Sequence, residues 1–169
     1  GNCTFANRSA IQMLGYREES DLIGENLHAL AHHAYPDGRP YPETACPVLR
    51  PLNQGEASHS LDEVFWRADG SIFPVEFWSH PVYRDKRVVG IVSTFIDITE
   101  RKAAARALRD SEQMLRNVLV HFPGTVFWKD RQSVYLGCNN AFSTAAGRAQ
   151  PAEIIGKTDY DLPWADTEA

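Results

Sequence analysis

At 169 residues the chain can hold one domain or two small ones, and an apolar fraction of 43% predicts at least one packed core. The 17 basic and 22 acidic residues give a net charge of -5 and form no basic stripe, which argues against binding to a nucleic-acid backbone. No apolar run approaches the roughly 20 residues of a membrane-spanning helix, and no signal peptide opens the sequence.

Cysteine usage indicates the compartment. Cys3, Cys46 and Cys138 are odd in number and far apart, and the sequence contains no C-x-x-C pair. A disulfide framework is therefore not expected, and a reducing cytoplasm fits the composition best.

The first part of the chain predicts an α+β domain. A short strand at 2–5 precedes three short helices, which are expected to end near Gly15, Gly24 and His32. An interrupted helix at 44–56 and three strands between 59 and 99 follow, with an Asp69–Gly70 hairpin turn between the first two of these strands. Short helices before a strand meander indicate an antiparallel sheet with helices on one face.

An internal repeat indicates a second domain. Residues 4–30 can be laid on residues 136–162 without a gap, at the constant offset of 132 that separates Asn7 from Asn139. The same offset relates Gly15 to Gly147, and it relates Ile23 and Gly24 to Ile155 and Gly156. A period this long indicates two copies of one domain rather than a solenoid.

The order of "FANRSAIQMLGY", "LIG", "RADGSIFPVEF" and "DITERK" resembles the PAS (Per-Arnt-Sim) sensor family. The resemblance implies a tandem PAS fragment of a bacterial sensor kinase, a cyclase or a similar signalling protein. It divides the chain into a first PAS domain at 1–99, a connecting signalling helix at 100–122 and the front half of a second PAS domain at 123–169. The first copy lacks the family's usual first strand, whereas the second has that strand at 125–129. Truncation accounts for this pattern, and exchange of the 125–129 strand between chains is the alternative.

The resemblance also implies a ligand pocket under the sheet of the first domain, lined by Leu27, Phe65, Val75, Phe77 and Phe95. Flavin-binding relatives carry a reactive cysteine at the position of Leu27 and amide side chains at those of Phe65, Val75 and Phe95. Apolar residues there leave a buried flavin ring without hydrogen bonds, at roughly 1–3 kcal/mol per group, so flavin is not favoured.

Haem relatives carry a histidine on the interrupted helix, where this chain has Thr44, so haem is not favoured either. The cofactor is therefore unknown.

Three histidines raise the question of a metal site. His28 and His32 stand at i, i+4 on one helix face, and Cys46 or Asp37 could complete a zinc set. Their spacing matches no known zinc pattern, and the segment around His33 is expected to be the entry to a solvated loop. No metal ligand is therefore predicted.

The end of the last strand predicts a signal relay. Asp97, Thr99 and Glu100 begin a helix from Ile98 onward, with Asp97 and Glu100 in a capping-box pattern. Beyond them, residues recur at intervals of three and four and form a marginal coiled-coil seam of about three heptads. The seam residues are Arg101, Ala104, Leu108, Ser111, Leu115, Val118 and Phe122. The helix is expected either to pair in a homodimer and lead to an output domain, or to pack on its own sheet.

No catalytic motif appears in the sequence: it contains no G-x-S-x-G, no Walker loop and no transmitter signature. The chain is therefore not expected to be an enzyme, and any kinase or cyclase activity is expected outside it. Two alternatives stay open: a ligand-free PAS dimerisation module, and a metal-dependent enzyme fragment that uses His28, His32 and Cys46. On the outer face of the sheet, Trp78 is expected to mark a docking surface.

Overall fold

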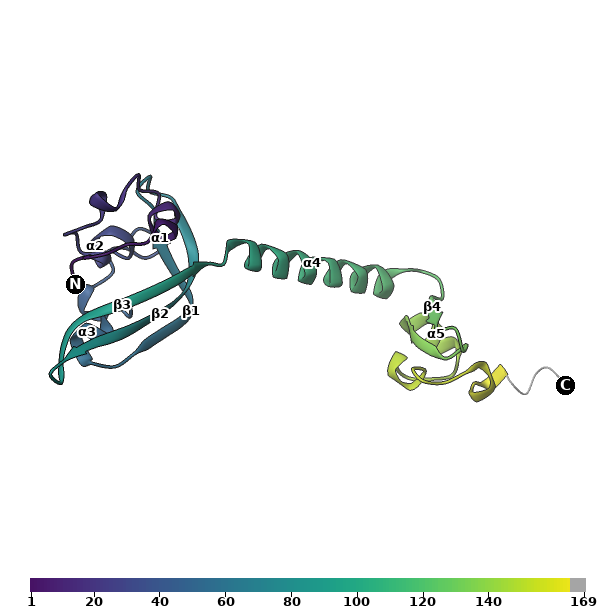
Figure 1. Ribbon diagram of the computed structural model, residues 1–169. Coiled ribbons are helices and arrows are strands. Elements are labelled where there is room, and N and C mark those ends of the chain that lie inside the picture. The colour runs from purple at the N-terminus through teal and green to yellow at the C-terminus, as the bar shows by residue number, and fades with distance from the viewer. Residues whose placement is uncertain (165–169) are drawn as a thin grey trace. The chain divides into compact units, whose positions relative to one another are not determined.

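The computed structural model describes residues 1–164 and divides the chain into two compact units (Figure 1). The first unit is Gly1–Ala104, and the second begins at Ala105. Each unit has its own hydrophobic core, so each is described by itself.

The first unit is built on a three-stranded antiparallel sheet of order β1-β2-β3. Its strands are β1 (Ser58–Trp66), β2 (Ile72–Arg84) and β3 (Arg87–Asp97). Asp85 and Lys86 connect β2 to β3, and both have positive φ, as a tight hairpin with the right-handed strand twist requires. The ladder between β2 and β3 extends to the pair Val75–Asp97, and Asp97 is the last residue of β3.

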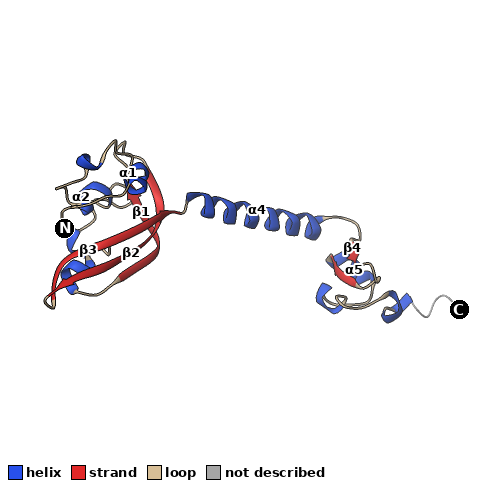
Figure 2. Ribbon diagram, viewed as in Figure 1, coloured by secondary structure: helices blue, strands red, loops and turns tan. Residues whose placement is uncertain are grey.

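Short helices cover one face of this sheet (Figure 2). They are α1 (Arg8–Met13), α2 (Leu27–Ala31) and α3 (Arg50–Gln54), with 3-10 turns at Glu19–Asp21 and Glu43–Ala45. The core lies between the helices and the sheet, and its buried residues are Leu14, Leu22, Ala31, Cys46, Val48, Leu49, Phe65, Phe73, Val75 and Phe77.

The predicted strand alternation is present in the middle of β2. Val75, Phe77 and Ser79 are fully buried on the helix side, whereas His80 is exposed on the other side.

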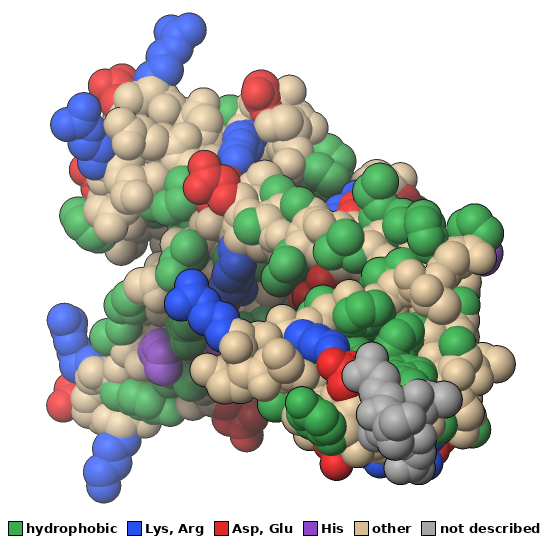
Figure 3. Space-filling view, turned by 90° about the vertical axis from the view of Figure 1, so that its right-hand side faces the viewer, with side chains coloured by type: hydrophobic (Ala, Val, Ile, Leu, Met, Phe, Trp, Pro, Cys, Tyr) green, Lys and Arg blue, Asp and Glu red, His purple; other side chains and the backbone are tan. Residues whose placement is uncertain are grey.

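The second unit contains a two-stranded sheet of β4 (Phe127–Lys129) and β5 (Tyr135–Cys138), followed by α5 (Asn140–Ala145). Two 3-10 turns follow, at Pro151–Glu153 and Asp159–Asp161. Its core consists of Tyr135, Cys138, Phe142, Ala146, Ile154 and Leu162. The unit also exposes large apolar side chains, among them Phe127, Leu136 and Ile155, and Figure 3 shows hydrophobic side chains among charged ones on one face of the molecule.

The predicted repeat is present in the backbone hydrogen bonds. The amide of Gly24 donates to the carbonyl of Cys3 over 2.9 Å, and 132 residues later Gly156 donates to Tyr135 over 2.8 Å. The reciprocal bonds, Cys3 to Glu25 and Tyr135 to Lys157, measure 2.7 and 2.8 Å.

Helices and caps repeat at the same offset: α5 corresponds to α1, and the 3-10 turn Pro151–Glu153 corresponds to Glu19–Asp21. Asn7 and Asn139 are the N-caps of α1 and α5, and each side chain accepts from the backbone amide three residues later. Gly15 and Gly147 follow these helices with φ of 77° and 66°. The two segments therefore share one local framework of caps, turns and bridges.

The long helix α4 (Thr99–His121) begins one residue later than the sequence predicts. The reason is that the amide of Ile98 donates to the carbonyl of Pro74, which bonds Ile98 to β2 just beyond the last ladder pair. All of α4 lies within the described residues, and none of its residues is buried. Within residues 1–164 no helix combines the length and the hydropathy needed to cross a membrane.

Two predicted strands differ from the structure. The expected strand at 2–5 is reduced to a single bridge between Asn2 and Asn26. The expected strand at 125–129 is shorter, and β4 pairs with β5 inside its own unit. No exchange between chains is needed to give β4 a partner on this edge.

The cap residues of the two units predict different stabilities. Asn7 is exposed and accepts only from the amide of Ala10, so Asn7→Ala should cost about 1 kcal/mol. Asn139 is buried, accepts from the amides of both Val126 and Phe142, and donates to the carbonyl of Gly124. Asn139→Ala should therefore cost more, about 1–3 kcal/mol, because it leaves partly buried groups unpaired.

Hydrogen exchange of peptides that span 124–145 measures this loss, with the exposed neighbour Asn140→Ala as the control. Equal protection in Asn139→Ala and Asn140→Ala would contradict the role of Asn139.

Candidate functional site

A cavity of about 520 Å³ lies in the first unit, beside the core. One wall is the N-terminal segment Asn2–Ala6, and the other is β3 from Val89 to Phe95. Leu27 and Leu30 of the α2 region contribute apolar side chains to it. Since β3 pairs only with β2 in its sheet, its second edge faces this space and offers backbone N–H and C=O groups.

The five predicted pocket residues divide into two groups. Leu27 and Phe95 line the cavity. Phe65, Val75 and Phe77 lie in the packed core instead, where each is at most 1% exposed. The ring centre of Phe65 lies 6.3 Å from that of Phe77 and 5.3 Å from that of Phe95, so these aromatic rings occupy the space under the sheet.

The one buried hydroxyl on this face of the sheet already has partners. Ser79 lies in the middle of β2 and is fully buried. Its hydroxyl lies 2.8 Å from the carbonyl oxygen of Val48, to which it donates, and 2.8 Å from the hydroxyl of Ser93. The Ser79 hydroxyl is therefore satisfied within the first unit, among apolar core side chains.

The expectation of a solvated loop entry is wrong for His32 and confirmed for His33. His28 and His32 are 8% and 2% exposed, whereas His33 is exposed and its ring lies 5.3 Å from that of Trp66. The helix α2 turns one face to the core, and the i, i+4 spacing places His28 and His32 together on that face. The i, i+4 spacing predicts that the two histidines share a face, but α2 is too short for an apolar period to show that this face is buried.

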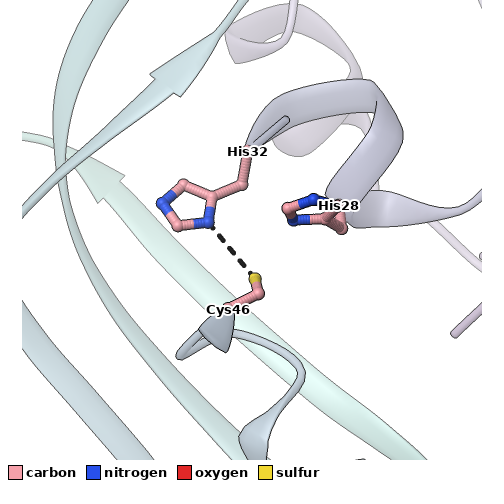
Figure 4. A group of neighbouring side chains, drawn as sticks. All are labelled: His28, His32 and Cys46. Carbon is pink, nitrogen blue, oxygen red and sulfur yellow. Dashed lines mark hydrogen bonds between the residues drawn. The ribbon is translucent and has the colours of Figure 1, made fainter. Parts of the chain in front are cut away.

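His32 connects two parts of the unit. Its Nδ1 lies 3.2 Å from Sγ of Cys46 (Figure 4). Its Nε2 lies 3.2 Å from a carboxylate oxygen of Glu63 on β1. Burial alone would lower the pKa of His32, but the hydrogen bonds and charges of Cys46 and Glu63 outweigh burial and raise the pKa to about 9. For His28, burial and the neighbouring His32 lower the pKa.

A second group of charged residues surrounds the end of β3. Arg67, directly after β1, donates to the carboxylate of Asp97 over 2.8 Å and to the carbonyl of Met13 over 3.0 Å. Its guanidinium also lies 3.8 Å from the ring centre of Phe73. Asp97 in turn accepts from the amide of Thr99 over 2.8 Å and from its hydroxyl.

Ile98 joins β3 to α4 and is only 2% exposed. Beyond it, Arg101 donates over 2.8 Å to Glu76 of β2, and Lys102 forms an ion pair with Asp62 of β1. The first turn of α4 is thus bonded to both neighbouring strands, and Glu100, the third predicted relay residue, is exposed.

Two carboxylates of this group, those of Glu76 and Asp97, have a lowered pKa. The hydrogen bond from Arg101 lowers the pKa of Glu76, although burial opposes it. Burial alone would raise the pKa of Asp97, but hydrogen bonds from Thr99 and the charge of Arg67 outweigh burial and lower it.

On the outer face of the sheet, Trp78 is half-buried rather than open. Its ring stacks on that of His59 at 4.8 Å between centres and 8° between planes. His59 also lies 3.2 Å from the second carboxylate oxygen of Glu76. Sequence reasoning found neither these pairs nor the partners of Arg67, because each joins residues far apart in the chain.

Comparison with known proteins places the first unit in a family. No curated protein matches the chain. Among solved structures, 21 chains match. One of them, from a study entitled "Flavin Analogue Sheds Light on Light-Oxygen-Voltage Domain Mechanism", is 20% identical, with a TM-score of 0.46. The match covers 66% of this chain and 78% of that chain.

The comparison with protein families identifies the fold of the first unit. Residues 1–98, more than half of the 169-residue chain, match the PAS fold. An antiparallel sheet with short helices on one face fits this assignment. The PAS fold implies a sensory or signalling module rather than a catalytic one. The protein belongs to the PAS family.

Proposed function

We propose that this chain is the sensory and relay part of a cytoplasmic bacterial signalling protein, of the sensor histidine kinase or cyclase type. The first PAS domain senses, and α4 carries the change to an output domain outside these residues. In this proposal the chain itself is not an enzyme, and its catalytic partner is the output domain of the parent protein.

The observation that carries the proposal is the joint between β3 and α4. Only Ile98 separates the strand from the helix, and it is buried and bonded to Pro74. Arg67, Glu76 and Asp62 hold the flanking residues by charged contacts. A joint packed in this way has few intermediate arrangements, so a shift of the sheet is passed to the helix as a discrete movement.

A small molecule bound beside β3 is the proposed stimulus. The cavity borders β3 over Val89–Phe95, and the joint follows two residues later. A ligand that fills this space contacts both the apolar side chains Leu27 and Phe95 and the unpaired backbone groups of the strand edge. It would thereby favour one position of β3 over another.

We also propose that α4 pairs with its copy in a homodimer. The apolar seam residues Leu108, Leu115, Val118 and Phe122 are each 50–62% exposed. A stripe of such residues at heptad spacing is buried when two helices pair. Ala104 and Ser111 keep the pairing weak, as a switch between two states requires.

We propose that the second unit contains the front half of a second PAS domain. The chain then consists of a first PAS domain at 1–99, a connecting helix at 100–122 and the partial second domain at 123–169. The support is the constant offset of 132 residues, which relates backbone hydrogen bonds as well as sequence: Tyr16 donates to Ile11, and Arg148 donates to Ser143.

A ligand-free dimerisation module is the second candidate. It is favoured by the packing of Phe65, Val75 and Phe77 in the core, which leaves the predicted pocket under the sheet filled with side chains.

The joint should be sensitive to Asp97. Asp97→Ala removes the acceptor for Thr99 and the partner of Arg67, so it should cost about 0.5–2 kcal/mol at the helix start. With the chain fused to the kinase part of a sensor histidine kinase, the basal autophosphorylation rate should change by up to about tenfold. Glu112→Ala, which removes an exposed carboxylate of α4 outside the seam, is the control. An unchanged rate in Asp97→Ala, despite faster hydrogen exchange at 98–102, would show that the signal does not pass through this joint.

The charge of Asp97 predicts a pH dependence. Because folding lowers its pKa, the carboxylate stabilises the folded state above its ordinary pKa of 3.8, and this contribution is lost as the pH falls through the lowered value. The difference in unfolding free energy between the wild type and Asp97→Asn should therefore be constant near neutral pH and shrink in strong acid. Urea unfolding across the acidic range measures it, and a difference that grows toward low pH would contradict the assignment.

The seam predicts a paired substitution. Leu115→Glu places a charge in the proposed helix pair and should raise the dimer dissociation constant at least about tenfold. Met114→Glu makes the same change one residue away, at a position 69% exposed and outside the seam, and should leave the constant near the wild-type value. Sedimentation equilibrium distinguishes them, and equal effects of the two variants would rule out this seam.

The cavity predicts binding of an apolar probe. Fluorescence titration with 1-anilinonaphthalene-8-sulfonate should give an affinity that falls at least about tenfold in Leu27→Trp, where the larger ring takes up cavity space. Ile23→Trp, at an exposed position outside the cavity lining, should bind like the wild type. Unchanged affinity in Leu27→Trp would favour the ligand-free module.

A further inference from the structure

Two neighbouring segments bring His28, His32 and Cys46 together. The helix α2 supplies His28, and His32 is its C-cap residue. The N-cap Asn26 accepts from the amides of His28 and Ala29. Cys46 ends the 3-10 turn Glu43–Ala45. Asn26 also donates to the Glu43 carboxylate over 2.9 Å, which joins the two segments directly. The cluster therefore stands on two anchored elements rather than on free loops.

The cluster has the dimensions of a metal site. One ring nitrogen of each histidine and Sγ of Cys46 all lie within 4.8 Å of one another, and all three residues are buried (Figure 4). Nδ1 of His32 is 3.2 Å from the sulfur. Nitrogen and sulfur ligands of a tetrahedral Zn²⁺ stand about 3.5 Å apart, as Zn–N and Zn–S bonds of roughly 2.0 and 2.3 Å require. Small side-chain adjustments are enough to reach that geometry.

An unsatisfied atom points to a missing partner. Nδ1 of His28 is buried and has no hydrogen-bond partner among residues 1–164. The whole residue is only 8% exposed, so water does not reach this atom freely. Buried polar atoms without a partner are rare in folded proteins, and an absent ion is one of the usual reasons.

Glu63 orients His32 from the opposite edge of the ring. Its carboxylate lies 3.2 Å from Nε2, while Nδ1 is directed at Cys46. An Nε2–H bond to a carboxylate leaves the lone pair on Nδ1, which is the tautomer that a metal ligand needs. Because Glu63 stands on the far side of the ring, it positions His32 without being a ligand. The ring of Tyr41, 4.3 Å from that of His32, covers the same site.

From this geometry we propose that His28, His32 and Cys46 bind a Zn²⁺ ion. Two imidazoles and a thiolate are a ligand set that zinc favours, and three protein ligands leave one coordination position for water or an external ligand. A second cavity of about 270 Å³ borders Cys46 on the side of α3. The ion ties α2 to the segment before α3 and, through Glu63, to β1.

The test uses the full chain, stripped with a chelator and then titrated with Zn²⁺ in competition with a chromogenic chelator. Wild-type protein should bind one zinc per chain. Cys46→Ser and His28→Gln should each lower the affinity at least about 100-fold. Glu63→Gln, a positioning change, should lower it about 10- to 100-fold. Cys3→Ser and His33→Gln alter the same residue types outside the cluster and should bind like the wild type.

Co²⁺ in place of zinc provides an independent readout. It should give a thiolate-to-metal charge-transfer band that is present in Cys3→Ser and absent in Cys46→Ser. Circular dichroism shows which variants fold. If a ligand variant does not fold, the zinc affinity of Glu63→Gln still tests the proposal. A folded wild type that takes up no zinc, or equal affinity in Cys46→Ser and Cys3→Ser, would overturn the proposal.

Discussion

The first unit depends on the way in which its last strand is continued into a helix. A strand that leaves the sheet normally does so through a turn, but here β3 ends at Asp97, Ile98 is still bonded to Pro74 of β2, and the helix begins at the next residue. This requires the carboxylate of Asp97 to satisfy Thr99 at the start of the helix while it also neutralises Arg67. Arg67 also reaches the carbonyl of Met13, so the same guanidinium attaches the helical layer to the joint. Helices, sheet and α4 therefore share one charged contact.

Local chemistry made much of the fold predictable. Asparagine caps, left-handed glycines and the capping boxes at Glu18 and Gln150 depend on residues within a few positions of one another, which is why the repeat could be aligned without a gap. Alternation placed Val75 and Phe77 in the core, because a strand that buries one face must follow a period of two. The exact start of α4 was missed by one residue, since only the tertiary bond from Ile98 to Pro74 delays it.

The sites were less predictable because their contacts join residues far apart in the chain. His32 meets Glu63 across 31 positions, and Arg67 meets Asp97 across 30. Glu76 lies on the outer face, where alternation predicts exposure, yet Arg101 and His59 cover it. The residues near Glu76 in the sequence do not predict its burial, because the arginine that covers it belongs to α4. A pattern along the chain shows which face a side chain takes, but only the fold shows what it finds there.

A single irregularity in β1 links the two sites. The register of β1 against β2 shifts between Ser60 and Glu63, so this stretch forms a bulge. From it, Asp62 pairs with Lys102 of α4, while Glu63 contacts His32 of the buried cluster. Bulges re-aim side chains at a cost to the ladder, and this one supplies a carboxylate to each side of the sheet.

The same strand leads directly to Arg67, about 13 Å beyond Glu63 at the usual rise per residue. A displacement of β1 along its axis would disturb the histidine contact, the Lys102 pair and the Arg67–Asp97 pair together. Strand register changes in whole steps, since each residue of slip turns the buried face outward. β1 is therefore constrained to hold all three contacts in one arrangement, and the buried cluster and α4 both contact this one strand.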